Sequence, residues 1–248
     1  GNCKGRAMIF LFKNELLEAT ITSLYANTNY PVTNIQSDFL YKKFKATTYG
    51  DTIHMVLPRN TSIDCFFYAY SNATSMTVRL YDNTSTLLDT ITVDCTGSTK
   101  PLKSGSAHFT AQTVRIIEVD ATCPVTEDLF IGGLAAGTGI YNILPLISFD
   151  KDFDDPSSKD ASDYGQVSYQ YVPALLNYSL SFNSIPRSTY HTFADSFHAI
   201  GSGFIWIDIT EDNHAVYQPM YCTTNFIAGV DRNDYYTVSF SIKFTEAR

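Results

Sequence analysis

Residues 76–93, MTVRLYDNTSTLLDTITV, have the pattern of two strands joined by a turn. The flanks, 76–81 and 87–93, are rich in β-branched and aromatic residues, which favour the pleated, half-buried surface of a sheet. Between them stands Asp82-Asn83-Thr84-Ser85, a run of residue types whose side chains bond to their own backbone in tight turns. The stretch therefore predicts a β-hairpin with its tip at 82–85.

Similar short strands are predicted on both sides of this hairpin. Residues 53–57, 63–70 and 114–119 are each rich in β-branched or aromatic residues. Turn-forming runs separate them, such as Pro58-Arg59-Asn60 and Thr96-Gly97-Ser98. Short strands that recur about every 8–12 residues with turns between them are typical of sandwiches. We therefore expect a mainly β fold, with a jelly-roll β-sandwich in the N-terminal half.

A glycine-rich stretch interrupts this rhythm. Residues 131–139, IGGLAAGTG, are small, apolar and flexible; we interpret them as a hinge or a strand-end turn and place the domain junction near them. The predicted division is a jelly-roll domain over 8–138 and a β-rich domain over 139–248. Residues 1–7, which precede Met8, have the appearance of a cloning scar.

One helix is predicted in the second half, near 187–200. Tyr190, Phe193, Phe197 and Ile200 recur at the spacing that lines one face of a helix, and Pro186 is tolerated in a first helical turn. This predicts a β-rich α+β second domain with one main helix.

The rest of the second half reads as strands and one acidic loop. Strands are predicted over 175–182, 204–209 and 215–222. In residues 236–244 apolar and polar side chains alternate, which predicts a strand with one buried and one solvated face. Residues 150–160 carry many Asp residues and are predicted to form an exposed loop.

The charge of the chain limits the classes of partner. The formal net charge of the 248 residues is −8, and residues 123–248 carry 6 Lys and Arg against 15 Asp and Glu. An acidic protein of this kind is unsuited to non-specific binding of nucleic acid, which needs basic charge. The chain has no apolar run of 18 residues, so no membrane span is predicted.

The one pattern that points to a metal is acidic. Asp150, Asp152 and Asp154 have the alternating spacing of a calcium loop. However, Asp155 stands where that loop needs glycine, and Ala161 where it needs a bidentate Glu. We therefore keep these three aspartates only as a candidate cation site, and expect no catalytic residue and no cofactor.

Several other polar residues have ordinary structural interpretations. His191 and His198 lie seven residues apart, too far for the tight ligand clusters of metal sites, and are interpreted as surface or packing residues. Asp208, together with Glu211 and Asp212, is interpreted as part of a turn, although a spatial pair of carboxylates would suit glycoside hydrolysis. Trp206 lies in an apolar strand, which favours core packing over stacking on a sugar.

The cysteines do not form a recognisable framework. Apart from Cys3, the chain has Cys65, Cys95, Cys123 and Cys222, without the C-x-x-C spacing of zinc sites. We interpret them as small buried hydrophobic residues. A Cys65–Cys95 bridge between neighbouring strands stays open as an alternative.

The order of motifs from residue 8 resembles a known class of module. Residues 8–14, MIFLFKN, are followed by 18–23, EATITS, and 30–35, YPVTNI, and later by 128–137, DLFIGGLAAG. This order resembles the discoidin-like (galactose-binding-like) jelly rolls found in structural proteins of tailed bacteriophages, in which the last of these stretches is the closing strand. The second half resembles the assembly domains that accompany such modules.

The resemblance implies a role in a virion. It implies a structural component of a phage tail, tail tip or baseplate, made in the host bacterial cytoplasm. Its partners would be other tail proteins and copies of itself in a ring. The alternative is a carbohydrate-binding adhesion module that contacts host surface polysaccharide. Neither reading includes an enzymatic activity.

Overall fold

The computed structural model describes residues 8–37, 42–95, 103–141, 146–154, 158–161, 167–170, 175–200, 204–209, 220–225, 231–232 and 236–246. The chain forms two compact units. The first, which we call the sandwich unit, lies within Gly1–Asn142 and Phe204–Tyr221. The second, the helix unit, lies within Ile143–Gly203 and Cys222–Ala247. Phe204–Tyr221 thus belongs to the first unit, whereas the sequence-based division groups it with the second domain.

The sandwich unit is built almost entirely from strands. Its two short 3-10 helices and eleven strands are η1 (Glu15–Glu18), η2 (Val32–Gln36), β1 (Met8–Leu11), β2 (Thr20–Ser23), β3 (Phe44–Lys45), β4 (Gly50–Ser71), β5 (Ser75–Tyr81), β6 (Leu87–Val93), β7 (Lys103–Thr122), β8 (Phe130–Ile131), β9 (Gly133–Gly137), β10 (Ile140–Tyr141) and β15 (Phe204–Ile209). The predicted hairpin at 76–93 is present as β5 and β6.

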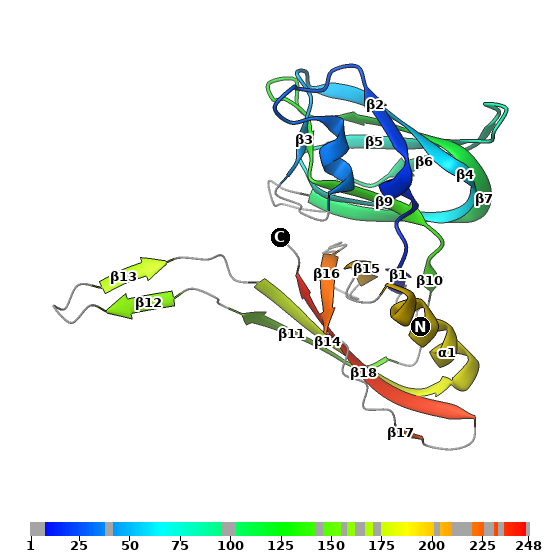
Figure 1. Cartoon of the computed structure of the whole chain (residues 1–248), viewed down its shortest axis with the longest axis vertical. Coiled ribbons are helices and arrows are strands. Elements are labelled where there is room, and N and C mark those ends of the chain that lie inside the picture. Colours follow the sequence, from blue (N-terminus) through cyan, green and yellow to red (C-terminus); the bar gives the residue numbers. More distant parts are fainter. Residues whose placement is uncertain are drawn as a thin grey trace, which may run out of the picture. The chain divides into compact units, whose positions relative to one another are not determined.

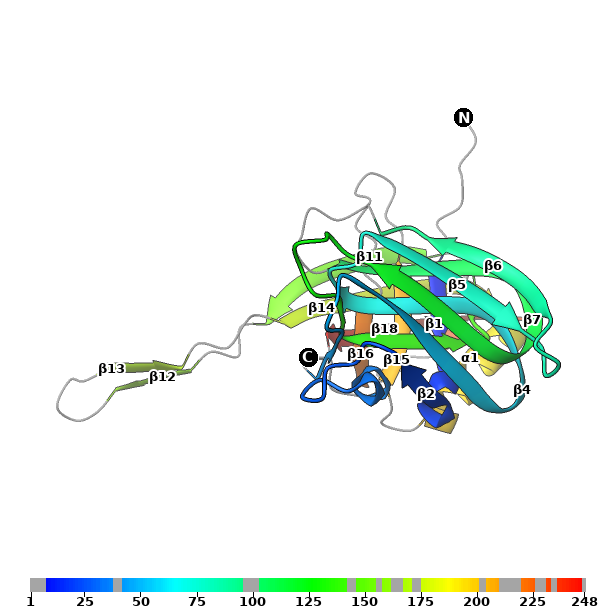
Figure 2. The same cartoon turned by 90° about the horizontal axis from the view of Figure 1, so that it is seen from above.

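Two long strands connect the layers of the sandwich. One sheet has the order β2-β4-β7-β5-β6, with β9 also paired to β4, and a two-stranded ladder joins β3 and β8. The strands β4 and β7 run antiparallel and curve together at one side of the unit (Figures 1 and 2). The two halves of β4 have different partners: β2 pairs with residues 53–56 and β9 with residues 65–69.

The predicted turn at Pro58-Arg59-Asn60 is wrong. The chain continues there as β4, and its pairing with β7 resumes at Thr61 after a register shift that starts at Val56. Proline has no N–H to donate to a ladder, so the irregular stretch places it where no such bond is needed. Two predicted strands are therefore one strand with a bulge.

The core lies between the layers and confirms the jelly-roll β-sandwich. Along β4 the residues Ile53, Met55 and Leu57 are buried, and their neighbours Thr52, His54 and Val56 are not. The same alternation in β5 buries every second residue from Met76 to Leu80. This period of two is what a half-buried sheet requires.

The glycine-rich stretch is a strand and not a hinge. β9 pairs antiparallel with β4, from Cys65 opposite Gly137 to Ala69 opposite Gly133, and all five of its residues are buried. A Cβ atom on Gly137 would lie 2.6 Å from the backbone oxygen of Lys13. The small residues of this stretch are thus explained by close packing, and the closing strand that the resemblance implies is present.

The helix unit contains one α-helix and a sheet. Its elements are β11 (Leu146–Asp154), β12 (Ser158–Ala161), β13 (Val167–Gln170), β14 (Leu175–Pro186), α1 (Arg187–Ile200), β16 (Met220–Asn225), β17 (Asp231–Arg232) and β18 (Thr237–Glu246). β18 lies between β16 and β14, β14 pairs with β11, and β12 pairs with β13 (Figure 1). The helix predicted near 187–200 is confirmed.

Aromatic side chains attach the helix to the sheet. The rings of Tyr190 and Phe193 in α1 lie 5.2 and 5.8 Å from the ring of Phe240 in β18. Phe182 of β14 stacks on Phe240 at 5.0 Å. Buried Val238, together with alternate residues to Phe244, confirms the alternation predicted for the last strand.

The predicted acidic loop at 150–160 is also wrong in large part. Asp150, Asp152 and Asp154 lie in β11, where their Cα atoms pair with those of Ser179, Asn177 and Leu175 in β14. Residues 158–160 are in β12, and 155–157 lie outside the described residues. Pairing with β14 stabilises this segment as a strand. Its Asp-rich sequence contains no sign of that pairing, which is why it reads as a loop.

Candidate functional site

Four loops of the sandwich unit are joined by hydrogen bonds into one surface, which we call the loop platform. It consists of residues 24–31, 46–49, 72–74 and 123–129, which connect β2 to η2, β3 to β4, β4 to β5 and β7 to β8. Backbone bonds join neighbouring loops, since Thr47 N donates to Tyr25 O (2.7 Å) and Ala46 N to Leu129 O (2.8 Å), and Thr74 N donates to Thr122 O at the end of β7 (2.7 Å). The loops therefore support one another.

Three tyrosines have fixed backbones and exposed side chains on this platform. The carbonyl of Tyr25 accepts the N–H of Thr47, that of Tyr30 accepts the N–H of Lys45 at 3.2 Å, and that of Tyr49 accepts the N–H of Cys123 at 2.7 Å. Yet these tyrosines remain 48%, 42% and 51% exposed. Packing in a hydrophobic core does not explain these tyrosines, because about half of each side chain remains exposed to solvent.

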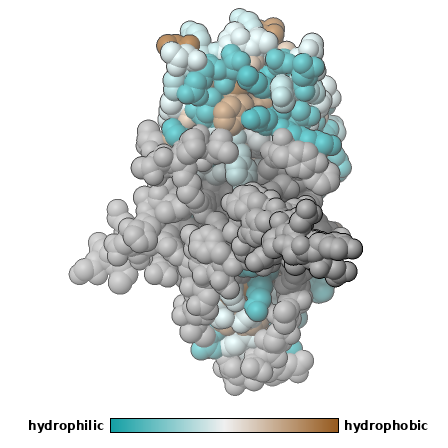
Figure 3. Space-filling view, turned by 90° about the vertical axis from the view of Figure 1, so that its left-hand side faces the viewer, coloured by the Kyte–Doolittle hydropathy of each residue, from teal (hydrophilic) through white to brown (hydrophobic). Residues whose placement is uncertain are grey.

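Exposed apolar residues are concentrated on the platform. Of the eight large hydrophobic residues that are exposed in the described part of the chain, five belong to these loops: Leu24, Tyr25, Tyr30, Tyr49 and Val125. Figure 3 looks at the side that is on the left in Figure 1, where hydrophobic residues stand singly among hydrophilic ones on the sandwich unit. Five of these eight side chains thus come from one set of loops, which makes the loop platform a candidate interaction surface.

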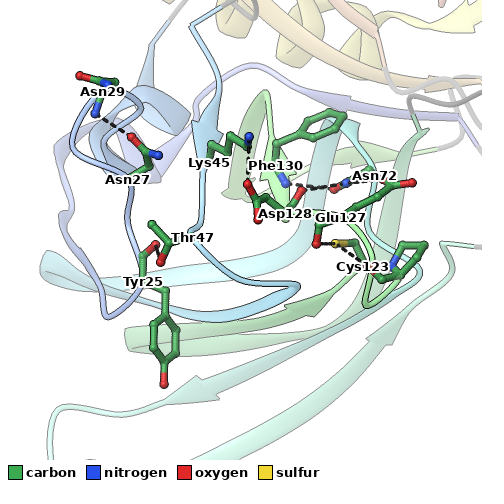
Figure 4. A network of polar contacts seen from close by, with 11 residues as sticks. Tyr25, Asn27, Asn29, Lys45, Thr47, Asn72, Cys123, Glu127, Asp128 and Phe130 are labelled. Atoms are coloured by element: carbon green, nitrogen blue, oxygen red, sulfur yellow. Dashed lines mark hydrogen bonds and ion pairs between the residues drawn. The ribbon is translucent and has the colours of Figure 1, made fainter.

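Asn72 holds the last of the four loops. Its Nδ2 donates to Glu127 Oε2 and to the backbone oxygen of Asp128, both at 3.0 Å, and its Oδ1 accepts from Phe130 N at 2.9 Å. Only 8% of the residue is exposed. Cys123 Sγ donates to the Glu127 carbonyl at 3.4 Å from the same loop (Figure 4).

Charged and amide groups stand near this network. Lys45 Nζ lies 3.0 Å from Asp128 Oδ2, and both side chains are partly exposed. Asn27 Oδ1 accepts the N–H of Asn29 at 2.9 Å. Figure 4 shows Tyr25 pointing away from the Lys45–Asp128 pair, so a ligand that touched both would have to be an extended molecule.

A second cluster, around Asp64 in β4, has a structural explanation. Asp64 Oδ1 accepts from Tyr141 Oη at 2.6 Å and from Gly139 N at 2.8 Å, and the Tyr141 ring lies 4.2 Å from that of His108. Burial and the Asp64 charge raise the pKa of the adjacent Cys65 thiol to about 12, and burial raises the pKa of Tyr141. A thiol that stays protonated is no nucleophile, so the cluster fastens the segment after β9.

Those residues singled out from the sequence that the structure describes have the following places in the fold. Trp206 is buried with its ring 5.9 Å from that of Phe67, which confirms core packing. Asp208 is not a turn residue: it is buried in β15 and bonded to Ser106. His191 and His198 are exposed on α1.

The cysteine alternatives are resolved for three residues. Cys65, Cys95 and Cys123 are free and buried, so the Cys65–Cys95 bridge is not formed. Glu211 and Asp212 lie outside the described residues. The candidate cation site at Asp150, Asp152 and Asp154 stays a prediction.

Sequence reasoning did not identify the loop platform. Each tyrosine of the platform reads as an ordinary β-forming residue, and the loops that carry them are separated along the chain by up to about a hundred positions. The available signal was their context: Tyr25, Tyr30 and Tyr49 each lie within two or three residues of Asn, Gly or Pro, the residues that mark turns.

The described residues contain neither a metal-binding cluster nor a membrane-spanning helix. No group of three or more His, Cys, Asp or Glu side chains among them is arranged to hold a metal ion. Within the same residues, no helix has the length and apolar character needed to cross a membrane.

Comparisons with known proteins give similarity at the level of structure. No family model matches the chain, and no curated protein matches it. A chitosan-binding module of a chitosanase/glucanase from Paenibacillus sp. IK-5 is 14% identical, with a TM-score of 0.42, over 51% of this chain and 99% of the module. A fucose-binding module from Streptococcus pneumoniae is 13% identical, with a TM-score of 0.43, over 50% and 94%. A Clostridium perfringens protein in complex with GalNAc-beta-1,3-galactose is 10% identical, with a TM-score of 0.43, over 51% and 100%.

Proposed function

We propose that the sandwich unit binds carbohydrate through the loop platform. The observation that carries this proposal is the pairing of fixed backbone and exposed ring at Tyr25, Tyr30 and Tyr49. Ordering a loop on binding costs free energy, and a loop that is already ordered avoids that cost. The platform is thus prepared for a ligand before the ligand arrives.

The chemistry of the platform suits sugars. A tyrosine ring offers an apolar face for the C–H groups of a sugar and a hydroxyl at its edge. The amides of Asn27 and Asn29 and the Lys45–Asp128 pair offer donors and acceptors for sugar hydroxyls. These groups are spread over the platform (Figure 4), which favours an oligosaccharide over a single sugar ring.

A glycan array tests the proposal directly. The full chain, labelled at its N-terminal amine, is applied to an array of plant, animal and bacterial glycans. We expect binding to a chemically related subset of oligosaccharides. The proposal would be contradicted if no glycan on the array gave a stronger signal with the folded chain than with a labelled albumin control.

We further propose that the chain is a structural component of a phage particle that works by protein–protein assembly and not by catalysis. The support is the sequence resemblance of the two halves to jelly rolls and assembly domains of tail proteins, together with the acidic second half. The role would be structural, in a tail, tail tip or baseplate ring. Mass spectrometry of purified virions is the test, and absence of this chain from the particles would overturn it.

A further inference from the structure

We propose that the ligand of the loop platform is an acidic polysaccharide, held by Lys43 and Lys45 beside Phe130. This inference rests on the proposed carbohydrate binding and specifies its chemical class. It follows from the charges on the β3–β8 ladder, which borders the platform. Lys45 of β3 is paired across this ladder with Phe130 of β8.

Lys43 presents a positioned positive charge. Its Nζ lies 4.6 Å from the centre of the Phe130 ring, a cation–π contact that holds the ammonium group in place. Within the described residues, no carboxylate pairs with it. Its backbone is fixed as well, because Asn34 Nδ2 donates to Lys43 O at 3.1 Å. The charge is therefore held in a fixed place beside the ring of Phe130.

Lys45 presents a second charge beside the same ring. It is the partner of Phe130 in the antiparallel ladder, and side chains of directly opposite residues lie on the same face of a sheet. The partner of Lys45, Asp128, is 45% exposed, and an ion pair between exposed groups contributes only about 0–1 kcal/mol. An anionic ligand can therefore take over the ammonium group at little cost.

Two ammonium groups beside one ring are a local feature of an acidic chain. Lys43 lies over the Phe130 ring and Lys45 is paired with Phe130 across the ladder, whereas the formal net charge of the chain is −8. Glu127 is already occupied by the amide of Asn72. The two ammonium groups, one of them in a weak exposed ion pair, favour a ligand that carries repeated negative charges.

A pair of polymers that differ only in charge tests the inference. Affinity gel electrophoresis of the full chain is run with polygalacturonate and with the same polymer after methyl esterification, and also with dextran sulfate and neutral dextran. We expect at least tenfold tighter binding to an acidic polymer than to its neutral counterpart, weakening as salt rises from 20 to 300 mM. The carboxylate and sulfate arms identify the acidic group.

Variants that each remove one charge show which lysines bind the acidic polymer. Lys43→Gln and Lys45→Gln each weaken binding to the acidic polymer about threefold to tenfold, whereas Arg59→Gln, which removes the same charge from the exposed bulge of β4, leaves it unchanged. Equal binding of esterified and free polymer, unaffected by Lys43→Gln, would overturn the inference and leave carbohydrate binding standing. Absence of binding to all four polymers and on the array would overturn both.

Discussion

The side-chain amide of Asn72 donates a 3.0 Å hydrogen bond to the carboxylate of Glu127, a residue that follows it by 55 positions. The same amide bonds the carbonyl of Asp128 and accepts the N–H of Phe130. One nearly buried side chain thus fixes the loop that carries Asp128, whose carboxylate meets Lys45. The geometry of this part of the platform depends on a residue that a ligand would not touch.

Asn72→Ala should therefore destabilise the fold and loosen the loop. The loss leaves buried backbone groups without partners, which costs about 1–3 kcal/mol. The measurement is the midpoint of urea unfolding of the full chain, followed by circular dichroism. Asn83→Ala, at the exposed tip of the β5–β6 hairpin, is the control and should leave the midpoint unchanged. Equal midpoints for the two variants would refute the role of Asn72.

Gly137→Ala should disturb the closing strand. The new methyl group would lie 2.6 Å from the backbone oxygen of Lys13, and overpacking of this kind costs about 1–3 kcal/mol. The matched control is Gly50→Ala, whose Cβ would meet a side-chain atom of Thr122 at 3.1 Å, so a smaller shift suffices. Thermal melting of both variants distinguishes them, and an unchanged melting temperature for Gly137→Ala would argue against a buried β9.

Stability should fall above pH 9 because of Cys65. Burial raises the pKa of this thiol from 9.0 to about 12, so the unfolded state loses its proton first. The stabilising difference is complete below pH 9 and is lost as pH rises toward 12, by up to about 1.4 kcal/mol per pH unit. Urea midpoints at pH 8, 9 and 10 measure the slope. The slope should be shallower in Cys65→Ala, and identical slopes would contradict the buried thiol.

Trp206 should report on the folding of the sandwich unit. It is the single tryptophan of the chain, is 3% exposed and packs against Phe67. We expect blue-shifted emission that iodide does not quench, and a red shift on unfolding. Trp206→Ala should cost about 3–5 kcal/mol, while Tyr236→Ala, which removes an exposed aromatic ring, should cost little. Strong quenching of the folded protein would disprove the burial of Trp206.

The local elements of the fold could be predicted because their signals are local. The β5–β6 hairpin, helix α1 and strand β15 lie where side-chain periodicity and turn residues predict them. The long strands β4 and β7 could not be predicted in this way. Pro58 and its neighbours have the sequence of a turn, and β4 continues through them only because it pairs with β7 on both sides. The same holds for β9, where packing against Lys13 selects glycine and alanine that resemble a flexible linker.

The loop platform depends on contacts that sequence does not contain. Tyr25 and Thr47 are 22 residues apart, and Asn72 and Glu127 are 55 apart. Loop closure brings these residues together, and no periodic pattern marks them. Likewise, β15 pairs with β1 from nearly the other end of the chain, so its return to the sandwich unit is a property of the tertiary fold.

The central claim is that the tyrosines of the loop platform bind a glycan. Its most direct test is the affinity of Tyr25→Ala and Tyr49→Ala for the glycan that gives the strongest array signal, measured by titration calorimetry. We predict about tenfold weaker binding for each, equivalent to about 1.4 kcal/mol, with melting temperatures unchanged because both rings are half exposed. Tyr236→Ala, in the helix unit, is the matched control and should bind like the unaltered protein. Platform variants that bind as tightly as this control would contradict the account.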